Sequence, residues 1–183
     1  MTDQKPVKLP GQGRSTGTAM LSPCGTYRYR LDRVRDDGPC VAWLMLNPST
    51  ADAEVDDPTI RRCIGFSKRW GYGRMVVVNL FALRAADPRA LAKNTDSVGV
   101  SNNYWILQAL KGGARECICA WGCQQHLSTP ALRLRPVEVL ALLRSHYTPA
   151  MCRGWRKDGA PRHPLMLGYD TPREAFDLRT RTP

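Results

Sequence analysis

The sequence contains no apolar run of the roughly 18 to 20 residues that a helix needs to cross a bilayer. Its first residues, MTDQKPVKLPGQGR, also lack the apolar core of a secretory signal. Both absences argue against membrane-spanning and exported proteins, so we expect a soluble, cytoplasmic protein. The chain has 183 residues and 43% hydrophobic content, which suits one globular domain with its own core.

Acidic side chains are scarce, with 16 Asp and Glu against 27 Lys and Arg, and the formal net charge is +11. A positive excess of this size favours polyanions, so we expect DNA or a nucleotide as the partner and no membrane. Two alternatives stay open: a basic surface without a partner, and a GC-rich genome that raises the share of arginine. We expect the protein to be a monomer.

Common cofactor and nucleophile motifs are missing. The sequence has no P-loop, no G-x-S-x-G elbow and no H-E-x-x-H helix. Its seven cysteines, without a secretion signal, favour free thiols in a reducing compartment. Cys117, Cys119 and Cys123 form C-x-C-x3-C, which is not a standard zinc spacing, and an iron–sulfur cluster stays an alternative. We expect no cofactor and no bound metal.

The order of the predicted elements is typical of an α/β fold. Tyr27 to Asp32 alternate between apolar and polar residues, which predicts a half-exposed, antiparallel strand. Continuous apolar runs predict buried parallel strands over residues 40–47, 75–83 and 116–122. Helical spacing is found over residues 58–70, 100–111 and 132–146. We therefore expect a three-layer fold with a central, mainly parallel sheet and an added N-terminal antiparallel strand.

We expect a single domain over residues 19–172. Residues 1–18 are rich in Gly, Pro, Lys, Ser and Thr and predict a flexible basic tail. Residues 173–183 are polar and basic, and they predict a second tail at the C-terminus.

The loops after the predicted parallel strands are the expected binding site, because ligands of open α/β sheets bind beyond the carboxyl ends of the strands. The first such loop begins with Asn47, Pro48 and Ser49, whose backbone a ligand can approach closely. The acids Asp52, Glu54, Asp56 and Asp57 follow. They either cap the next helix and face solvent, or bind a metal, or include one group, for which Asp52 is our candidate, that orients a water.

Further candidates lie at the ends of the other strands. Asn79 interrupts an apolar strand, so it is either tied to a neighbouring loop or poised at the site. Phe81 and Trp121 could stack on a base, and Arg84 opens the loop after the second buried strand. His163, in RHPLML, could donate a hydrogen bond to a developing anion, although a lone histidine is most often structural.

Several segments carry a family resemblance: YRYRLDR, WLMLNPSTADAEVDDPTIRRC, VVVNLFALRAADPRAL and GAPRHPLML. Over roughly residues 20–170 they resemble a bacterial and phage family catalogued as a domain of unknown function. The order of elements is also similar to the uracil-DNA glycosylase superfamily, with LNPS, VVVNLFALR, ECICAWG and RHPLML in the places of its motifs. This second resemblance implies a uracil-DNA-glycosylase-like fold. It also implies that Asn47 positions the attacking water, Asn79 pairs with the base and His163 stabilises the leaving base.

Three hypotheses of function follow. The first is a DNA glycosylase-like hydrolase that cleaves the N-glycosidic bond of a base, modified or not. The second is a non-catalytic module that binds DNA or a nucleotide in phage defence or base modification. The third is a metal-dependent enzyme that acts on a small molecule or nucleotide and uses the acidic loop.

Overall fold

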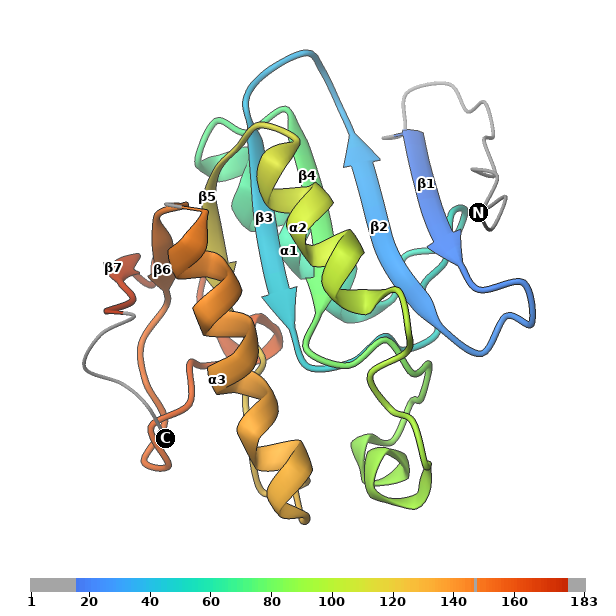
Figure 1. Ribbon diagram of the computed structural model, residues 1–183. Helices are drawn as coiled ribbons and strands as arrows, with labels where there is room; N and C mark the ends of the chain where they lie inside the picture. The colour runs from blue at the N-terminus through green and yellow to red at the C-terminus, as the bar shows by residue number, and fades with distance from the viewer. Residues whose placement is uncertain (1–15, 147, 178–183) are drawn as a thin grey trace.

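A computed structural model describes residues 16–146 and 148–177 of the chain (Figure 1). The described residues form a seven-stranded sheet in the order β1-β2-β4-β3-β5-β6-β7. The strands are β1 (Thr16–Leu21), β2 (Arg28–Val34), β3 (Cys40–Met45), β4 (Arg74–Asn79), β5 (Ala114–Cys119), β6 (Ala150–Cys152) and β7 (Glu174–Ala175). The helices are α1 (Pro58–Arg69), α2 (Asn102–Lys111) and α3 (Pro130–Ser145), with 3-10 turns η1 (Pro88–Lys93) and η2 (Pro164–Met166).

The α/β prediction is confirmed, but the prediction of a mainly parallel sheet needs correction. Strand β3 pairs in parallel with β4 and β5, and β5 pairs in parallel with β6. The outer pairs β1–β2, β2–β4 and β6–β7 are antiparallel, so the described sheet is mixed. Parallel neighbours need long crossovers, whereas the short connection between β1 and β2 permits antiparallel pairing alone.

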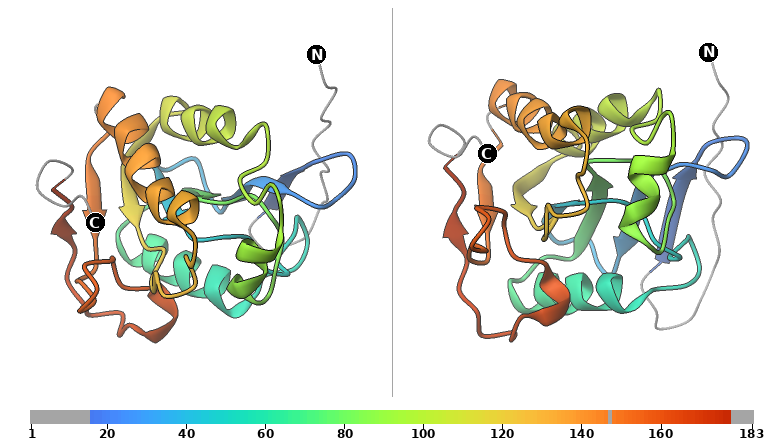
Figure 2. Two further views of the ribbon diagram at one scale, coloured as in Figure 1. Left: turned by 60° about the horizontal axis from the view of Figure 1, so that its bottom comes forward. Right: turned by 90° about the horizontal axis from the view of Figure 1, so that it is seen from below.

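Helices cover both faces of the sheet (Figure 2). Helices α2 and α3 lie on one face, where Leu44 and Val76 join a buried cluster with Ile106 and Leu140. Helix α1 lies on the other face. There Trp43, which precedes Leu44 in β3, packs with Phe66 of α1. Successive residues of a strand point to opposite faces, so a strand between two helical layers is apolar throughout. This packing explains the continuous apolar runs in the sequence.

Helix α1 begins where the sequence predicts. The Oδ1 atom of Asp57 accepts a hydrogen bond from the backbone N–H of Ile60 at 2.8 Å, and Pro58 occupies the first helical position. Helix α3 begins at Pro130, capped by Thr129, two residues before the predicted start. In the described ranges no helix combines the length and apolar character that a membrane span requires.

The sheet extends into both segments that the sequence predicts as tails. Strand β1 starts at Thr16, which pairs with Val34, and β7 pairs with β6 after residue 172. Phe176 is buried, with its ring centroid 4.8 Å from that of Trp155. The remaining parts of the predicted tails, residues 1–15 and 178–183, lie outside the described residues.

Candidate functional site

A pocket of about 340 Å³ lies at the carboxyl ends of the parallel strands. Its walls include residues that follow β3, the last residue of β4 and residues that follow β5. The first turn of α1 and the segment before η2 complete it. This is the edge at which open α/β sheets bind their ligands.

The pocket brings together sequence-predicted site residues from distant parts of the chain. The predicted residues that line it are Asn47, Ser49, Asn79, Trp121 and His163. They belong to the loop after β3, to β4, to the loop after β5 and to the segment before η2. Their placement is therefore known, whereas their chemical roles stay predictions.

Other predicted residues do not line the pocket. Phe81 is fully buried in the core. Its backbone N–H donates to the Leu46 carbonyl at 2.9 Å, so the pairing between β3 and β4 continues past Asn79 and the ring packs inside. It therefore cannot stack on a base in the pocket. The guanidinium of Arg84 donates to the Gly25 carbonyl at 3.2 Å and anchors the turn between β1 and β2. Pro48 is buried, and its carbonyl accepts the backbone N–H of Ala85 at 2.9 Å.

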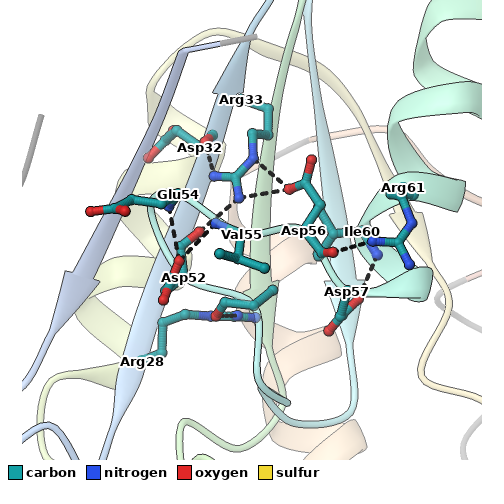
Figure 3. A network of polar contacts seen from close by, with 11 residues as sticks. Arg28, Asp32, Arg33, Asp52, Glu54, Val55, Asp56, Asp57, Ile60 and Arg61 are labelled. Atoms are coloured by element: carbon teal, nitrogen blue, oxygen red, sulfur yellow. Dashed lines mark hydrogen bonds and ion pairs between the residues drawn. The ribbon is translucent and has the colours of Figure 1, made fainter. Parts of the chain in front are cut away.

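Two buried arginines of β2 hold the acidic loop that connects β3 to α1 (Figure 3). Arg33 pairs with the carboxylate of Asp56 at 2.7 Å and donates to the Asp52 carbonyl oxygen at 2.7 Å. Arg28 donates to the carbonyl oxygen of Ala51. Two of the acids that follow the core strand therefore have structural roles, since the carboxylate of Asp56 pairs with β2 and that of Asp57 caps α1.

The carboxylate of Asp52 acts within its own loop. Its Oδ1 atom accepts the backbone N–H groups of Glu54 and Val55 at 2.9 and 2.8 Å, and these bonds lower the pKa of Asp52. Asp52 is not among the pocket-lining residues, which corrects its expected place beside a catalytic water. Over residues 16–146 and 148–177, no three His, Cys, Asp or Glu side chains are grouped to hold a metal ion.

Asn47 joins the loops that follow β3 and β4. Its Nδ2 group donates to the carbonyl oxygens of Pro48 at 3.1 Å and Ala85 at 2.8 Å. Both amide hydrogens are thereby used, and the orientation of the side chain is fixed. Its Oδ1 atom accepts none of the hydrogen bonds found within the described residues, and Asn47 lines the pocket.

Asn79 places an unpaired amide at the same pocket. The residue is 1% exposed, and its Nδ2 group has no hydrogen-bond partner within the described residues. A buried donor without an acceptor costs about 1–3 kcal/mol. Among the described residues the Nδ2 group of Asn79 is therefore not tied to a neighbouring loop, and a role of this side chain at the site stays a prediction.

His163 presents a neutral imidazole. Its Nδ1 atom accepts the backbone N–H of Leu165 at 3.3 Å, so the neutral ring carries its proton on Nε2. Burial lowers the pKa of His163, and the charge of Asp57 opposes this shift in part. At neutral pH the Nε2–H group is consequently available as a hydrogen-bond donor.

Arg28 is a pocket residue that the sequence pattern conceals. Alternation with Tyr27 and Tyr29 predicts that Arg28 faces solvent, yet it is 2% exposed and lines the pocket. The register between β1 and β2 shifts beside Arg28. Met20 pairs with Arg30 and the next residue, Leu21, pairs with Arg28, so Tyr29 has no partner on β1 in this register. A bulge of this kind re-aims side chains, and single-sequence periodicity does not reveal it.

Other polar residues also line the pocket: Asp57, Thr59, Cys123, His126 and Arg156. The sequence analysis names Asp57 among the acids of the loop and Cys123 in the cysteine cluster, but it misses Thr59, His126 and Arg156. Thr59 could have been found from its position, because the helix after a parallel strand begins at the edge where that strand ends. His126 and Arg156 lie in loops whose path depends on tertiary packing, so no local signal marks them.

Comparison with known proteins places the chain in a family. Residues 28–165 match the family model described as "Protein of unknown function (DUF1643)". The chain belongs to this family. The matched span contains every residue that lines the pocket. No curated protein and no solved structure matches the chain.

In this member of the DUF1643 family, Gly122 allows the loop after β5 to approach His163 closely. Its φ is 75°, and an added Cβ would lie 2.9 Å from the Cβ of His163. We expect Gly122→Ala to lower the free energy of unfolding by about 2–4 kcal/mol, through backbone strain and overpacking. Urea denaturation measures this loss.

Gly113→Ala is the matched control for Gly122→Ala. Gly113 has a φ of 86°, and an added Cβ there would meet nothing within 4 Å. Its substitution should therefore cause the backbone strain alone, about 1–2 kcal/mol. Equal losses in the two variants would contradict the close packing of Gly122 on His163.

Proposed function

We propose that this DUF1643 protein is a DNA glycosylase-like hydrolase that cleaves the N-glycosidic bond of a base, modified or unmodified, bound in the pocket. The observation that carries the proposal is that Asn47, Asn79 and His163 line one pocket at the carboxyl edge of the parallel strands. The similarity in element order to the uracil-DNA glycosylase superfamily supports the same assignment, and with it a fold of that type.

Charge and redox state support a nucleic-acid partner inside the cell. The net charge of +11 favours binding to the phosphates of DNA. None of the seven cysteines, all of which lie in the described ranges, forms a disulfide, which suits the reducing cytoplasm that we propose as the site of action. The protein acts as a monomer in this proposal.

Recognition requires the target base to leave the DNA stack. Flipping a base costs a few kcal/mol, which contacts in the pocket must offset. The pocket of about 340 Å³ lies within the range of small-molecule sites and can hold a base. The amide of Asn79 supplies a donor for an acceptor on the hydrogen-bonding edge of the base.

Hydrolysis then needs an oriented water and a stabilised leaving group. Asn47 holds its Oδ1 atom ready to accept a hydrogen bond from the water, which attacks the sugar carbon. As the new C–O bond forms, the C–N bond breaks and its electron pair leaves with the base. The Nε2–H group of His163 stabilises the negative charge on the departing base, and a proton of the water passes to solvent.

A second candidate is a module that binds DNA or a nucleotide without chemistry. The observation that favours it is the position of Asp52, whose carboxylate closes its own turn and does not line the pocket. This candidate predicts DNA binding that weakens linearly on a log–log plot against salt, with no released base. The metal-dependent alternative gains no support from the acids, since Asp56 pairs with Arg33 and Asp57 caps α1.

Release of free base tests the proposed reaction. We expect the full chain to liberate base from DNA containing uracil or a hypermodified pyrimidine, detected by chromatography. Asn47→Ala should lower the rate by about 10²-fold, because the water loses its oriented acceptor. Asn94→Ala is the control, because Asn94 is exposed and accepts the backbone N–H of Asp96 away from the pocket. Unchanged release by Asn47→Ala would refute the role of Asn47, and salt-dependent binding without release would favour the second candidate.

A further inference from the structure

Three buried N–H groups without an acceptor belong to residues that line the pocket. They are the Nε group of Arg28, the Nδ2 group of Asn79 and the Nε1 group of Trp121, none of which has a partner within the described residues. The three residues are 2%, 1% and 3% exposed. Buried N–H groups are nearly always paired, so three orphan donors around one pocket indicate a ligand that supplies the acceptors.

The pocket is also positively charged at Arg28. Arg28 takes part in none of the ion pairs found among the described residues, and it donates to the backbone carbonyl of Ala51. Burial lowers its pKa to about 10, so the guanidinium keeps its charge at neutral pH. The charge of Asp57 supports it, but that carboxylate caps α1 through the N–H of Ile60. A buried cation without an ion-pair partner calls for an anionic ligand.

We propose that the pocket selects a pyrimidine that carries an anionic oxygen group, a carboxylate or a phosphate, bound by Arg28, Asn79 and Trp121. The inference rests on the proposed function in taking the ligand to be a base. All three groups are donors and one is a cation, which matches oxygen atoms that share a negative charge. A neutral pyrimidine would leave Arg28 without an ion-pair partner, with only the more distant charges of Asp57 and Asp52 to oppose its own. In DNA the anionic group is a carboxylate on the base, and in a free nucleotide it is the phosphate.

Ligand titrations of the full chain test this selectivity. The probes are 2′-deoxyuridine, 5-carboxy-2′-deoxyuridine and deoxyuridine monophosphate, with Kd measured by calorimetry. We expect one anionic probe to bind with a Kd at least about tenfold lower than that of deoxyuridine, as for a charge-assisted hydrogen bond. Tighter binding of the carboxylated nucleoside assigns a modified base, and tighter binding of the monophosphate assigns a nucleotide. Equal Kd values for the neutral and anionic probes would overturn the proposal.

Variants assign the selectivity to the named donors. Arg28→Met removes the charge, and Trp121→Phe removes the Nε1–H group while keeping a ring. Each should reduce the ratio of the deoxyuridine Kd to the anionic-probe Kd about tenfold. Trp121→Phe is the decisive variant if Arg28→Met fails to fold, because it leaves the bond from Arg28 to Ala51 intact. If Trp121→Phe keeps the wild-type preference for the anionic probe, Trp121 is not a donor to the anionic group, and the proposed set of donors is overturned.

Arg135→Met is the matched control. Arg135 is also 2% exposed, but its Nε group donates to the Leu80 carbonyl at 2.7 Å and it does not line the pocket. Its variant should keep the anionic preference, and loss of the preference there would overturn the assignment to Arg28. A preference without any release of base contradicts the proposed hydrolysis alone. Release of plain uracil without a preference contradicts this inference alone.

Discussion

Replacing His163 by alanine is expected to lower the rate of base release by about 10²- to 10³-fold, the usual effect of losing one donor to a developing anion. The reason is that Nδ1 is engaged by the N–H of Leu165, so Nε2–H is the donor that the ring can offer to the departing base. Single-turnover kinetics with saturating protein isolates the chemical step. His163→Gln retains an N–H donor and should recover part of the rate.

His146→Ala serves as the control for His163→Ala. His146 ends α3, its Nδ1 atom lies 2.8 Å from the Ser145 hydroxyl, and it does not line the pocket. This variant should release base at the wild-type rate. An equal loss of rate in both histidine variants, or no loss in either, would contradict the role of His163.

The pH dependence of His163 follows from its burial. Burial lowers the pKa of this histidine below its ordinary value of 6.5, so the folded protein favours the neutral ring. Its contribution to stability is complete above pH 6.5 and is lost as the pH falls through the lower folded-state pKa. The base-release rate should therefore stay level from pH 8 to 6.5. A protonation step seen above pH 6.5 by NMR of the imidazole would contradict the neutral donor.

Arg33→Met is expected to lower the free energy of unfolding by about 3 kcal/mol, because it leaves the carboxylate of Asp56 without its partner. Arg33 is 4% exposed and also donates to the carbonyl oxygens of Asp32 and Asp52 at 2.9 and 2.7 Å. The loop between β3 and α1 thus loses a charged pair and one of its two arginine attachments to β2, while the bond from Arg28 to Ala51 remains. Urea denaturation monitored by circular dichroism measures the loss.

Arg35→Met is the comparison that isolates burial. Arg35 pairs with Asp36 at 2.9 Å, but the two side chains are 43% and 47% exposed. Exposed ion pairs contribute about 0–1 kcal/mol, so this substitution should be nearly neutral. Equal losses in the Arg33 and Arg35 variants would show that the acidic loop is not held as proposed.

The centre of the sheet could be predicted from the sequence because burial on both faces makes a strand apolar throughout. Trp43 and Val77 illustrate this, since each is buried in such a run. Strand β1 could not be predicted, because Thr16–Leu21 acquires its conformation by pairing with β2, and its composition resembles that of a loop. The mixed character of the sheet depends on such tertiary pairings.

The place of the candidate site followed from the rule that ligands bind at the carboxyl edge of parallel strands. That rule brought Asn47 and Asn79 together without knowledge of any side-chain contact. Phe81 was misplaced because the chain keeps strand-like pairing beyond Asn79, which turns this ring into the core. Arg28 was missed because a bulge reverses the alternation of β2. Both errors come from local geometry that tertiary packing sets.

The pocket draws its walls from almost the whole length of the domain, with Arg28 from β2 and His163 from the segment before η2. The N–H of Gly122 donates to the Pro161 carbonyl at 3.0 Å, so the segment before η2 attaches to the loop after β5, which is synthesised earlier. A nascent chain still on the ribosome consequently cannot complete the cavity until residue 163 has emerged. Products truncated before His163 would therefore lack part of the pocket wall.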